Sequence, residues 1–187
     1  MGTGGCDAGP ERRGGAQSVR PPGCRYGRLG DSPSPGDILA RTNQLLTDLD
    51  PELFTSCLIA ELDPLHHSVR LSNAGHPPPL LCHPDGSIEV LRLPPGLLLG
   101  IDHDTHYVTT EIALPPGAIL GLYTDGLVAT PGTDIEDTIS ELAQHLAQAR
   151  HLNLDELADT LIHHAKRDAP RFDDIALLLI RPTPNGD

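Results

Sequence analysis

The chain has 187 residues, of which 38% are hydrophobic and only 3% aromatic, and its formal net charge is −13. This length and content suit one domain with a core of Leu, Ile, Val and Ala plus a tail, and the acidic balance disfavours nucleic acid and anionic lipid as partners. No run approaches the roughly 18 apolar residues of a membrane span, and the four cysteines form no Cys-x-x-Cys pair, which fits a reduced, cytoplasmic setting.

The first segment with a structural signal begins at Ser34. Residues 1–33 are rich in Gly, Pro, Arg and Ser without periodicity, so we expect a disordered head. Ser34 is suited to cap a helix, Pro35 to its first position, and Asp37 to the first turn. Apolar residues then recur at helical spacing, which predicts a helix over 36–49.

A block rich in short strands follows the helix. The mostly apolar stretch 54–62 predicts a strand, Asp63 and Pro64 break it, and the alternation over 67–72 predicts its hairpin partner. Turn residues delimit further strands, expected at 80–82, 88–92 and 107–112. Five or six short antiparallel strands at this spacing are expected to form a sheet.

An acidic residue stands at the end of the next apolar run. The run 117–120 is typical of a strand, and Asp125 follows it with Gly126 directly after. A carboxylate at the end of a buried strand is costly unless it is paired, hydrogen-bonded or bound to a metal. Asp-Gly is also a common turn dipeptide, so the sequence leaves both a turn and a binding site open here.

Two amphipathic helices are predicted after this site. Thr133 and Glu136 form a capping-box pattern before an apolar stripe over 135–149. Asn153 and Glu156 repeat the signature before a second stripe over 154–165. Each stripe is wide enough to cover a sheet.

A second acidic site lies near the C-terminus. Asp173 and Asp174 directly precede the six-residue apolar run 175–180. They are either a solvated strand start or a source of carboxylates that strand pairing brings to Asp125. Hard divalent cations prefer carboxylate oxygens, which makes a shared cation site plausible chemistry. His76, between Gly and Pro, is better suited to a structural hydrogen bond than to a general acid.

Five motifs in this order resemble those of the metal-dependent protein phosphatase (PPM) family, in its bacterial SpoIIE-like branch. The resemblance covers about residues 36–181. The motifs are Phe54–Ala60, Leu71–Leu81 with its Asn-Ala-Gly-His-Pro-Pro run, Gly96–Gly100, Leu120–Leu127, and Asp173–Leu178.

The resemblance implies an α+β fold, a partial PPM-type sandwich of two antiparallel β-sheets flanked by helices, over residues 34–182, with 183–187 as a tail. It implies a serine/threonine protein phosphatase in which Mn²⁺ or Mg²⁺ activates water. Asp125 and Asp173 fall on metal-ligand positions, and Asp174 on a neighbouring position that supports a ligand. The resemblance also suggests a phosphoprotein substrate, such as a phosphorylated anti-sigma-factor antagonist.

One motif of the family has no counterpart in these 187 residues. It is the Gly-Asp-x-x-Gly-His-Gly segment, whose Asp bridges the two metals and which should precede the helix at 36–49; Gly30-Asp31 is followed by Ser-Pro-Ser-Pro instead. We therefore interpret the chain as the C-terminal two-thirds of a phosphatase domain, either N-terminally truncated or degenerate. Two hypotheses stay open: a phosphatase with Asp125 and Asp173 as ligands, and a noncatalytic binding module.

Overall fold

The computed structural model describes residues 32–129, 132–167 and 174–183. The chain divides after Ser32 into two units, and the fold below is that of the second unit, which begins at Pro33. No helix in the described part of the chain is both long enough and apolar enough to cross a bilayer.

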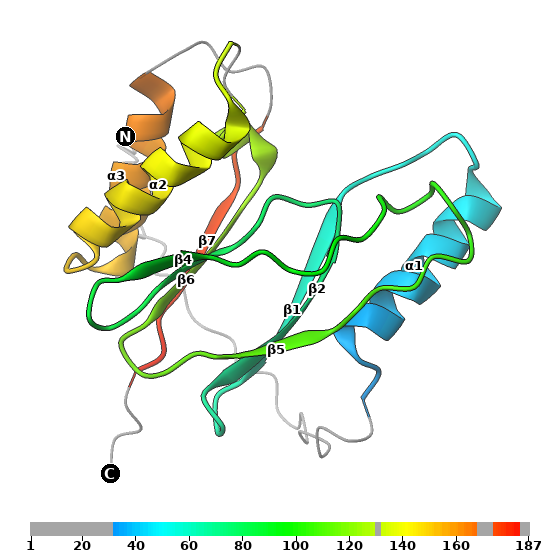
Figure 1. Cartoon of the computed structure of the whole chain (residues 1–187), viewed down its shortest axis with the longest axis horizontal. Coiled ribbons are helices and arrows are strands. Elements are labelled where there is room, and N and C mark those ends of the chain that lie inside the picture. The colour runs from blue at the N-terminus through cyan, green and yellow to red at the C-terminus, as the bar shows by residue number, and fades with distance from the viewer. Residues whose placement is uncertain (1–31, 130–131, 168–173, 184–187) are drawn as a thin grey trace, which may run out of the picture. The chain divides into compact units, whose positions relative to one another are not determined.

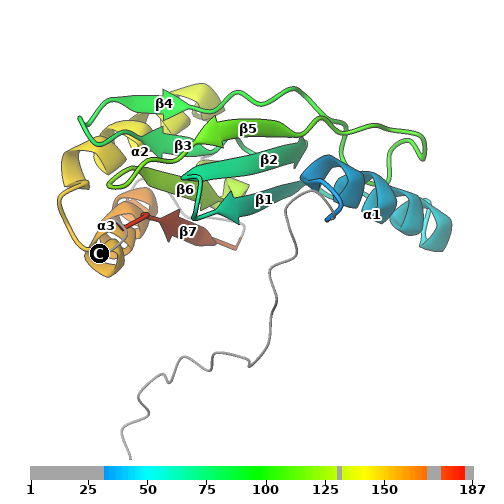
Figure 2. The ribbon, with the colours of Figure 1, turned by 90° about the horizontal axis from the view of Figure 1, so that it is seen from below.

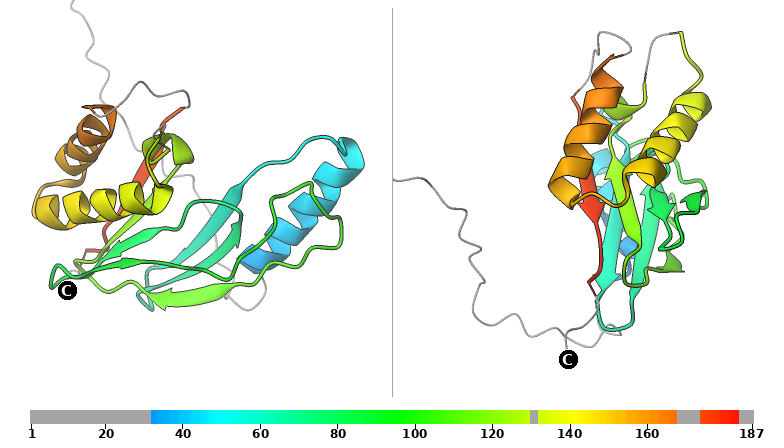
Figure 3. Two further views of the ribbon diagram at one scale, coloured as in Figure 1. Left: turned by 45° about the horizontal axis from the view of Figure 1, so that its top comes forward. Right: turned by 90° about the vertical axis from the view of Figure 1, so that its left-hand side faces the viewer.

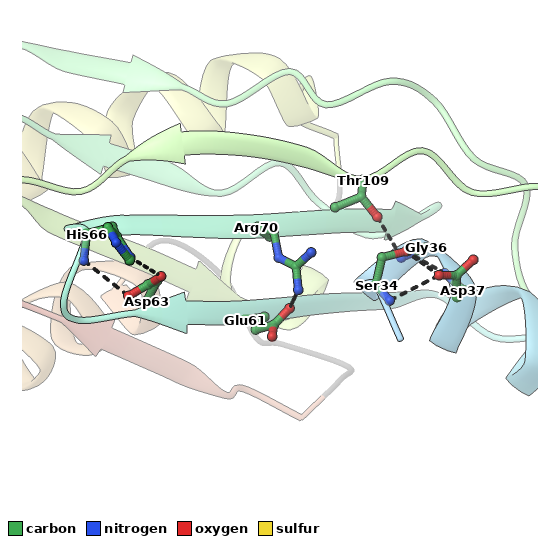
Figure 4. A network of polar contacts seen from close by, with 8 residues as sticks. All are labelled: Ser34, Gly36, Asp37, Glu61, Asp63, His66, Arg70 and Thr109. Carbon is green, nitrogen blue, oxygen red and sulfur yellow. Dashed lines mark hydrogen bonds and ion pairs between the residues drawn. The ribbon is translucent and has the colours of Figure 1, made fainter. Parts of the chain in front are cut away.

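Helix α1 (Pro35–Leu49) begins as its sequence predicts. The Ser34 side chain accepts a hydrogen bond from the Asp37 backbone N–H (3.2 Å), and the Asp37 carboxylate accepts one from the Ser34 backbone N–H (3.1 Å), which completes a capping box (Figure 4). The Gly36 N–H, otherwise unpaired in the first turn, donates to Thr109 Oγ1 at 2.9 Å. The start of α1 is thus tied to the segment that leads into β5.

The first sheet has three antiparallel strands in the order β1-β2-β5. These strands span Cys57–Asp63 (β1), Ser68–Ala74 (β2) and Thr110–Ala113 (β5). The predicted hairpin is confirmed as β1 and β2, paired from Cys57 opposite Ala74 to Asp63 opposite Ser68. Val69 and Leu71 are fully buried, as the alternation predicts.

The second sheet has four antiparallel strands in the order β4-β3-β6-β7. They span Leu80–Cys82 (β3), Ile88–Val90 (β4), Ile119–Tyr123 (β6) and Leu177–Ile180 (β7). The run that precedes Asp125 is therefore a central strand, and the C-terminal apolar run is its neighbour in the sheet (Figure 1).

Helices α2 (Ile135–Ala149) and α3 (Leu154–Arg167) follow β6. The cap of α3 is confirmed, because Asn153 Oδ1 accepts from the Glu156 N–H at 2.9 Å. The cap of α2 is not Thr133 as predicted but Asp134, whose carboxylate accepts from the Glu136 N–H at 2.9 Å. Asp is at least as good an N-cap as Thr, so the adjacent residue takes that place.

The helices and sheets form four layers in the order α1, first sheet, second sheet, α2 with α3 (Figures 1 and 3). Figure 2 shows α1 next to β1 and β2, on the side of the domain away from α2 and α3. A buried apolar cluster joins the two sheets through residues such as Leu71 and Leu120, and a second cluster joins α2 and α3 to the second sheet through Leu146 and Leu157. The α+β antiparallel sandwich flanked by helices is therefore confirmed.

The strands differ from the prediction in their limits and their grouping. Residues 54–56 and 107–109 lie outside β1 and β5, and β7 starts at Leu177 rather than at the acidic pair. Thr55 instead makes an isolated bridge to Leu99. The predicted sheet is in fact two sheets, because the segments after β2, β4 and β5 carry the chain from one layer to the other.

The turn between β1 and β2 depends on Asp63, which is buried. One carboxylate oxygen accepts from the backbone N–H groups of Leu65 (3.0 Å) and His66 (3.1 Å), and the other lies 2.6 Å from His66 Nδ1 (Figure 4). The hydrogen bond with the His66 side chain, helped by these backbone bonds, holds the pKa of Asp63 below its ordinary value of 3.8. A carboxyl with a lowered folded-state pKa contributes stability above its unfolded pKa and loses it as pH falls through the folded pKa.

We expect Asp63→Asn to destabilise the protein at pH 7 and to have a progressively smaller effect below about pH 4. Urea unfolding at pH 7 and at pH 3 measures this difference. Glu141→Gln, which neutralises an exposed carboxylate on α2, is the control and should change stability little at either pH. An Asp63→Asn deficit of equal size at both pH values would contradict the assignment.

We propose that residues 1–33 are dispensable for the stability of the domain. Their composition offers too little apolar surface to offset the entropy of ordering, and the cap residue Ser34 remains when they are deleted. The deletion should leave the melting temperature nearly unchanged by differential scanning calorimetry. A drop of many degrees would mean that the head packs on the domain.

Candidate metal centre

Asp125 lies where β6 ends and the short 3₁₀ turn η1 (Asp125–Leu127) begins. Its carbonyl accepts from the N–H groups of Val128 (2.9 Å) and Ala129 (2.6 Å), which closes the turn. Its own Oδ1 accepts from the Gly126 N–H at 3.0 Å, and the side chain is exposed. The turn is therefore confirmed, and Asp125 also presents a carboxylate to solvent at the end of a buried strand. Cation binding by that carboxylate stays a prediction.

Strand β7 brings the second acidic segment to the residue before Asp125. Tyr123 pairs with Leu177, so the chain just before β7 runs beside the end of β6. Thr124 fastens that chain: its hydroxyl donates to the Asp174 carbonyl (3.0 Å) and accepts from the Ala176 N–H (2.9 Å). Its own N–H donates to the Ala176 carbonyl at 3.0 Å.

The structure describes two of the three predicted site residues. Asp125 follows Thr124 directly in the chain, the Asp174 carbonyl accepts from the Thr124 hydroxyl, and the Asp174 side chain is exposed. Asp173 lies outside the described residues, so its distance from Asp125 remains a prediction. The pairing of the two strands that was expected to bring the acidic segments together is confirmed.

The loop that follows β2 reaches the same end of β6. His76 Nδ1 lies 3.1 Å from Ser56 Oγ. Burial lowers the pKa of His76, while an interaction with the Tyr123 backbone and the charge of Asp125 offset part of that effect. The ring is therefore neutral at pH 7, and its role as a hydrogen-bonding group agrees with the sequence interpretation. Ser56 was not predicted, because nothing local in the sequence links it to a histidine twenty positions later.

The donor atoms of this region suit a hard cation but do not complete a site. Asp125 supplies an exposed carboxylate, which is the ligand type that Mg²⁺ and Mn²⁺ prefer. In the part of the chain that the structure describes, no three His, Cys, Asp or Glu side chains gather closely enough to hold a metal ion. A site at Asp125 thus needs further carboxylates, of which Asp173 is the candidate in this chain.

Comparison with known proteins gives a match over most of the chain. The sequence profile of the family described as Stage II sporulation protein E (SpoIIE) matches residues 26–183. No curated protein matches the chain in sequence.

Several solved structures share the fold. The RsbU and RsbW domains of Rv1364c from Mycobacterium tuberculosis match with 26% identity and a TM-score of 0.64, over 75% of this chain and 41% of that one. The SiaA PP2C domain of Pseudomonas aeruginosa matches with 21% identity and a TM-score of 0.64, over 79% of this chain and 61% of that one. RsbX, solved in complex with magnesium, matches with 20% identity and a TM-score of 0.57, over 76% and 61%. The chain thus spans between 41% and 61% of the length of these three structures.

Proposed function

Because this chain belongs to the SpoIIE family of PPM phosphatase domains, we propose that it is part of a metal-dependent serine/threonine protein phosphatase in which Asp125 and Asp173 hold Mn²⁺ or Mg²⁺. The observation that carries the proposal is the pair of hydrogen bonds made by the Thr124 hydroxyl, which joins the residue before Asp125 to the backbone of Asp174 and Ala176. The magnesium bound by RsbX supports a cation of this class.

The residues around the site have separable tasks. Asp125 presents a carboxylate, while the Gly126 N–H fixes one of its oxygens. Thr124 keeps the backbone of Asp174 and Ala176 beside it, and Asp174, in this proposal, supports the ligands from a neighbouring position. A bound divalent ion would supply an acidified water and balance the negative charge of a phosphoryl group.

The substrate that we propose is a phosphoserine or phosphothreonine in a partner protein, such as an anti-sigma-factor antagonist. Structural likeness to RsbU and RsbX supports this class of substrate. The net charge of −13 disfavours nucleic acid and anionic membranes as partners, and we propose a cytoplasmic location.

The alternative is a noncatalytic PPM-like binding module. A specific observation favours it: the 187 residues contain no Gly-Asp-x-x-Gly-His-Gly segment, so no bridging carboxylate is supplied by this chain at the family position. The two functions differ in metal dependence, because a binding module has no need to hold Mn²⁺.

We expect Mn²⁺ to bind through Asp125 and Asp173, with affinity lost in either Asp→Asn variant. Titration of the whole chain with Mn²⁺, followed by the electron paramagnetic resonance signal of the free ion, measures binding. Asp155→Asn, which neutralises an exposed carboxylate in the first turn of α3, is the matched control and should bind as the parent does. Equal binding by all four proteins would remove the metal centre from this site.

A structure of the Mn²⁺ complex tests the geometry. The carboxylates of Asp125 and Asp173 should approach within about 8 Å, because one cation with ligands at roughly 2.3 Å is shared only by near neighbours. Carboxylates on opposite faces of the domain would rule out the assignment.

A further inference from the structure

Thr124 lies at the point where β6 separates from β7. The last pair of the two strands is Tyr123 with Leu177, and one step further along the ladder Thr124 lies opposite Ala176. In an antiparallel ladder, two opposite residues exchange both of their N–H···O bonds at every second position. The Thr124 N–H makes its half of this exchange, because it donates to the Ala176 carbonyl at 3.0 Å.

The other half of the exchange is made by the side chain of Thr124. The Ala176 N–H donates to Thr124 Oγ1 at 2.9 Å. The Thr124 carbonyl instead accepts from the Leu127 N–H at 2.9 Å, which is a bond of the turn η1. The hydroxyl thus takes the place of a carbonyl that the turn uses, and Ala176 keeps a partner although β6 has ended.

The same hydroxyl also takes the place of a donor. Continued pairing would put Gly126 opposite Asp174, and the Gly126 N–H would donate to the Asp174 carbonyl. The turn directs that N–H to Asp125 Oδ1 at 3.0 Å, and the Asp174 carbonyl accepts from the Thr124 hydroxyl at 3.0 Å. A hydroxyl has one hydrogen to donate and two lone pairs that accept, so one side chain serves both purposes.

We propose that Thr124 is a positioning residue of the candidate metal centre: its hydroxyl replaces two backbone groups of the ladder, so that β6 can turn at Asp125 while residues 174–176 stay bound beside it. This inference rests on the proposed function. The turn leaves the Asp125 carboxylate exposed, and the two bonds of the hydroxyl limit how far the turn can move from the backbone of Asp174.

The first measurement is amide hydrogen exchange at Ala176 in the whole chain, which reports the hydrogen bonds of Thr124 without a metal. Thr124→Val keeps the shape of the side chain but removes the hydroxyl, and Thr124→Ser keeps the hydroxyl. We expect Thr124→Val to raise exchange at Ala176 about tenfold, the order expected for a lost hydrogen bond, and Thr124→Ser to stay close to the parent. Should Thr124→Val fail to fold, Thr124→Ala removes the same hydroxyl from a smaller side chain.

The second measurement is the affinity for Mn²⁺, which tests the positioning role. Groups that orient a metal ligand typically change metal affinity 10–100-fold. We expect Thr124→Val to weaken Mn²⁺ binding about tenfold and Thr124→Ser to recover most of the affinity. Thr42→Val is the matched control for both measurements, because it removes an exposed hydroxyl that donates to the Ile38 carbonyl within α1.

The two measurements separate this inference from the proposed function. If Asp125→Asn binds Mn²⁺ as the parent does, the proposed metal site fails and the positioning role with it, whereas exchange at Ala176 still shows whether the hydroxyl completes the ladder. If Asp125→Asn loses affinity and Thr124→Val keeps it, Thr124 holds the strands together without positioning a ligand. Exchange at Ala176 that is unchanged in Thr124→Val, or raised equally in Thr124→Ser, overturns the role of the hydroxyl.

Discussion

Replacing Asn43 with alanine should lower the free energy of unfolding by roughly 2–4 kcal/mol, because buried hydrogen-bonding groups left without a partner cost about 1–3 kcal/mol each. Asn43 lies on α1 and is fully buried. Its Nδ2 donates to the carbonyls of Asp102 (2.8 Å) and His103 (3.2 Å), and its Oδ1 accepts from the Gly100 N–H (2.7 Å). One side chain thus satisfies three backbone groups of a loop some 60 positions away.

Gln44→Ala is the matched control, because Gln44 is the next residue on the same helix and is exposed. It should change stability by less than about 0.5 kcal/mol. Urea unfolding followed by circular dichroism measures both variants. An Asn43→Ala deficit as small as that of the control would mean that water or a rearranged loop satisfies the three backbone groups.

Local signals in the sequence predicted those parts of the fold that depend on neighbours in the chain. The capping box of Ser34 with Asp37 and the cap at Asn153 involve residues three positions apart, and both are present. The β1–β2 hairpin is equally local. The role of Asn43 was not predicted, because a helical Asn reads as a polar surface residue until the loop that it serves is known.

The limits of strands were harder to predict, because apolar alternation continues past the point where pairing stops. Residues 54–56 continue the pattern of β1, yet Thr55 pairs with Leu99 in an isolated bridge instead. Similarly, the division into two sheets depends on which strands pair after the chain crosses between layers. Neither fact is contained in the pattern of any single segment.

For the candidate site, the sequence predicted the position of Asp125 and the pairing of β6 with β7. It did not predict the hydrogen bonds of Thr124 and Ser56. Asp125 stands at the end of β6 as expected, since an Asp-Gly pair after an apolar run marks a strand end. Thr124 joins segments about fifty positions apart, and Ser56 meets a histidine twenty positions later. Such contacts are set by strand register and by loop shape, which a sequence pattern does not specify.

The 187-residue chain by itself should be a poor phosphatase, with hydrolysis of a small aryl phosphate close to background in millimolar Mn²⁺ and little reduced by Asp125→Asn. Two-metal hydrolysis needs a ligand that spans both ions and keeps them roughly 3.5–4 Å apart. The described residues bring no three potential ligands together, and Asp173 adds one carboxylate to Asp125. Because ligand charge largely sets affinity for hard cations, the two carboxylates should hold one ion weakly. An attacking water would then be activated by one metal ion rather than two.

The assay compares the parent, Asp125→Asn, the control Asp155→Asn, and a longer chain that carries a Gly-Asp-x-x-Gly-His-Gly segment before α1. Strong activity of the parent that Asp125→Asn abolishes and Asp155→Asn leaves intact would show that the site is complete without the bridging motif, and the prediction would be wrong. If the parent and its variants are inert while the longer chain is active, the missing carboxylate is supplied by the Gly-Asp-x-x-Gly-His-Gly segment. If the longer chain is inert as well, the result supports the binding-module alternative. A catalytic centre that still contains functional Asp125 and Asp173 should hydrolyse the substrate once the bridging carboxylate is supplied.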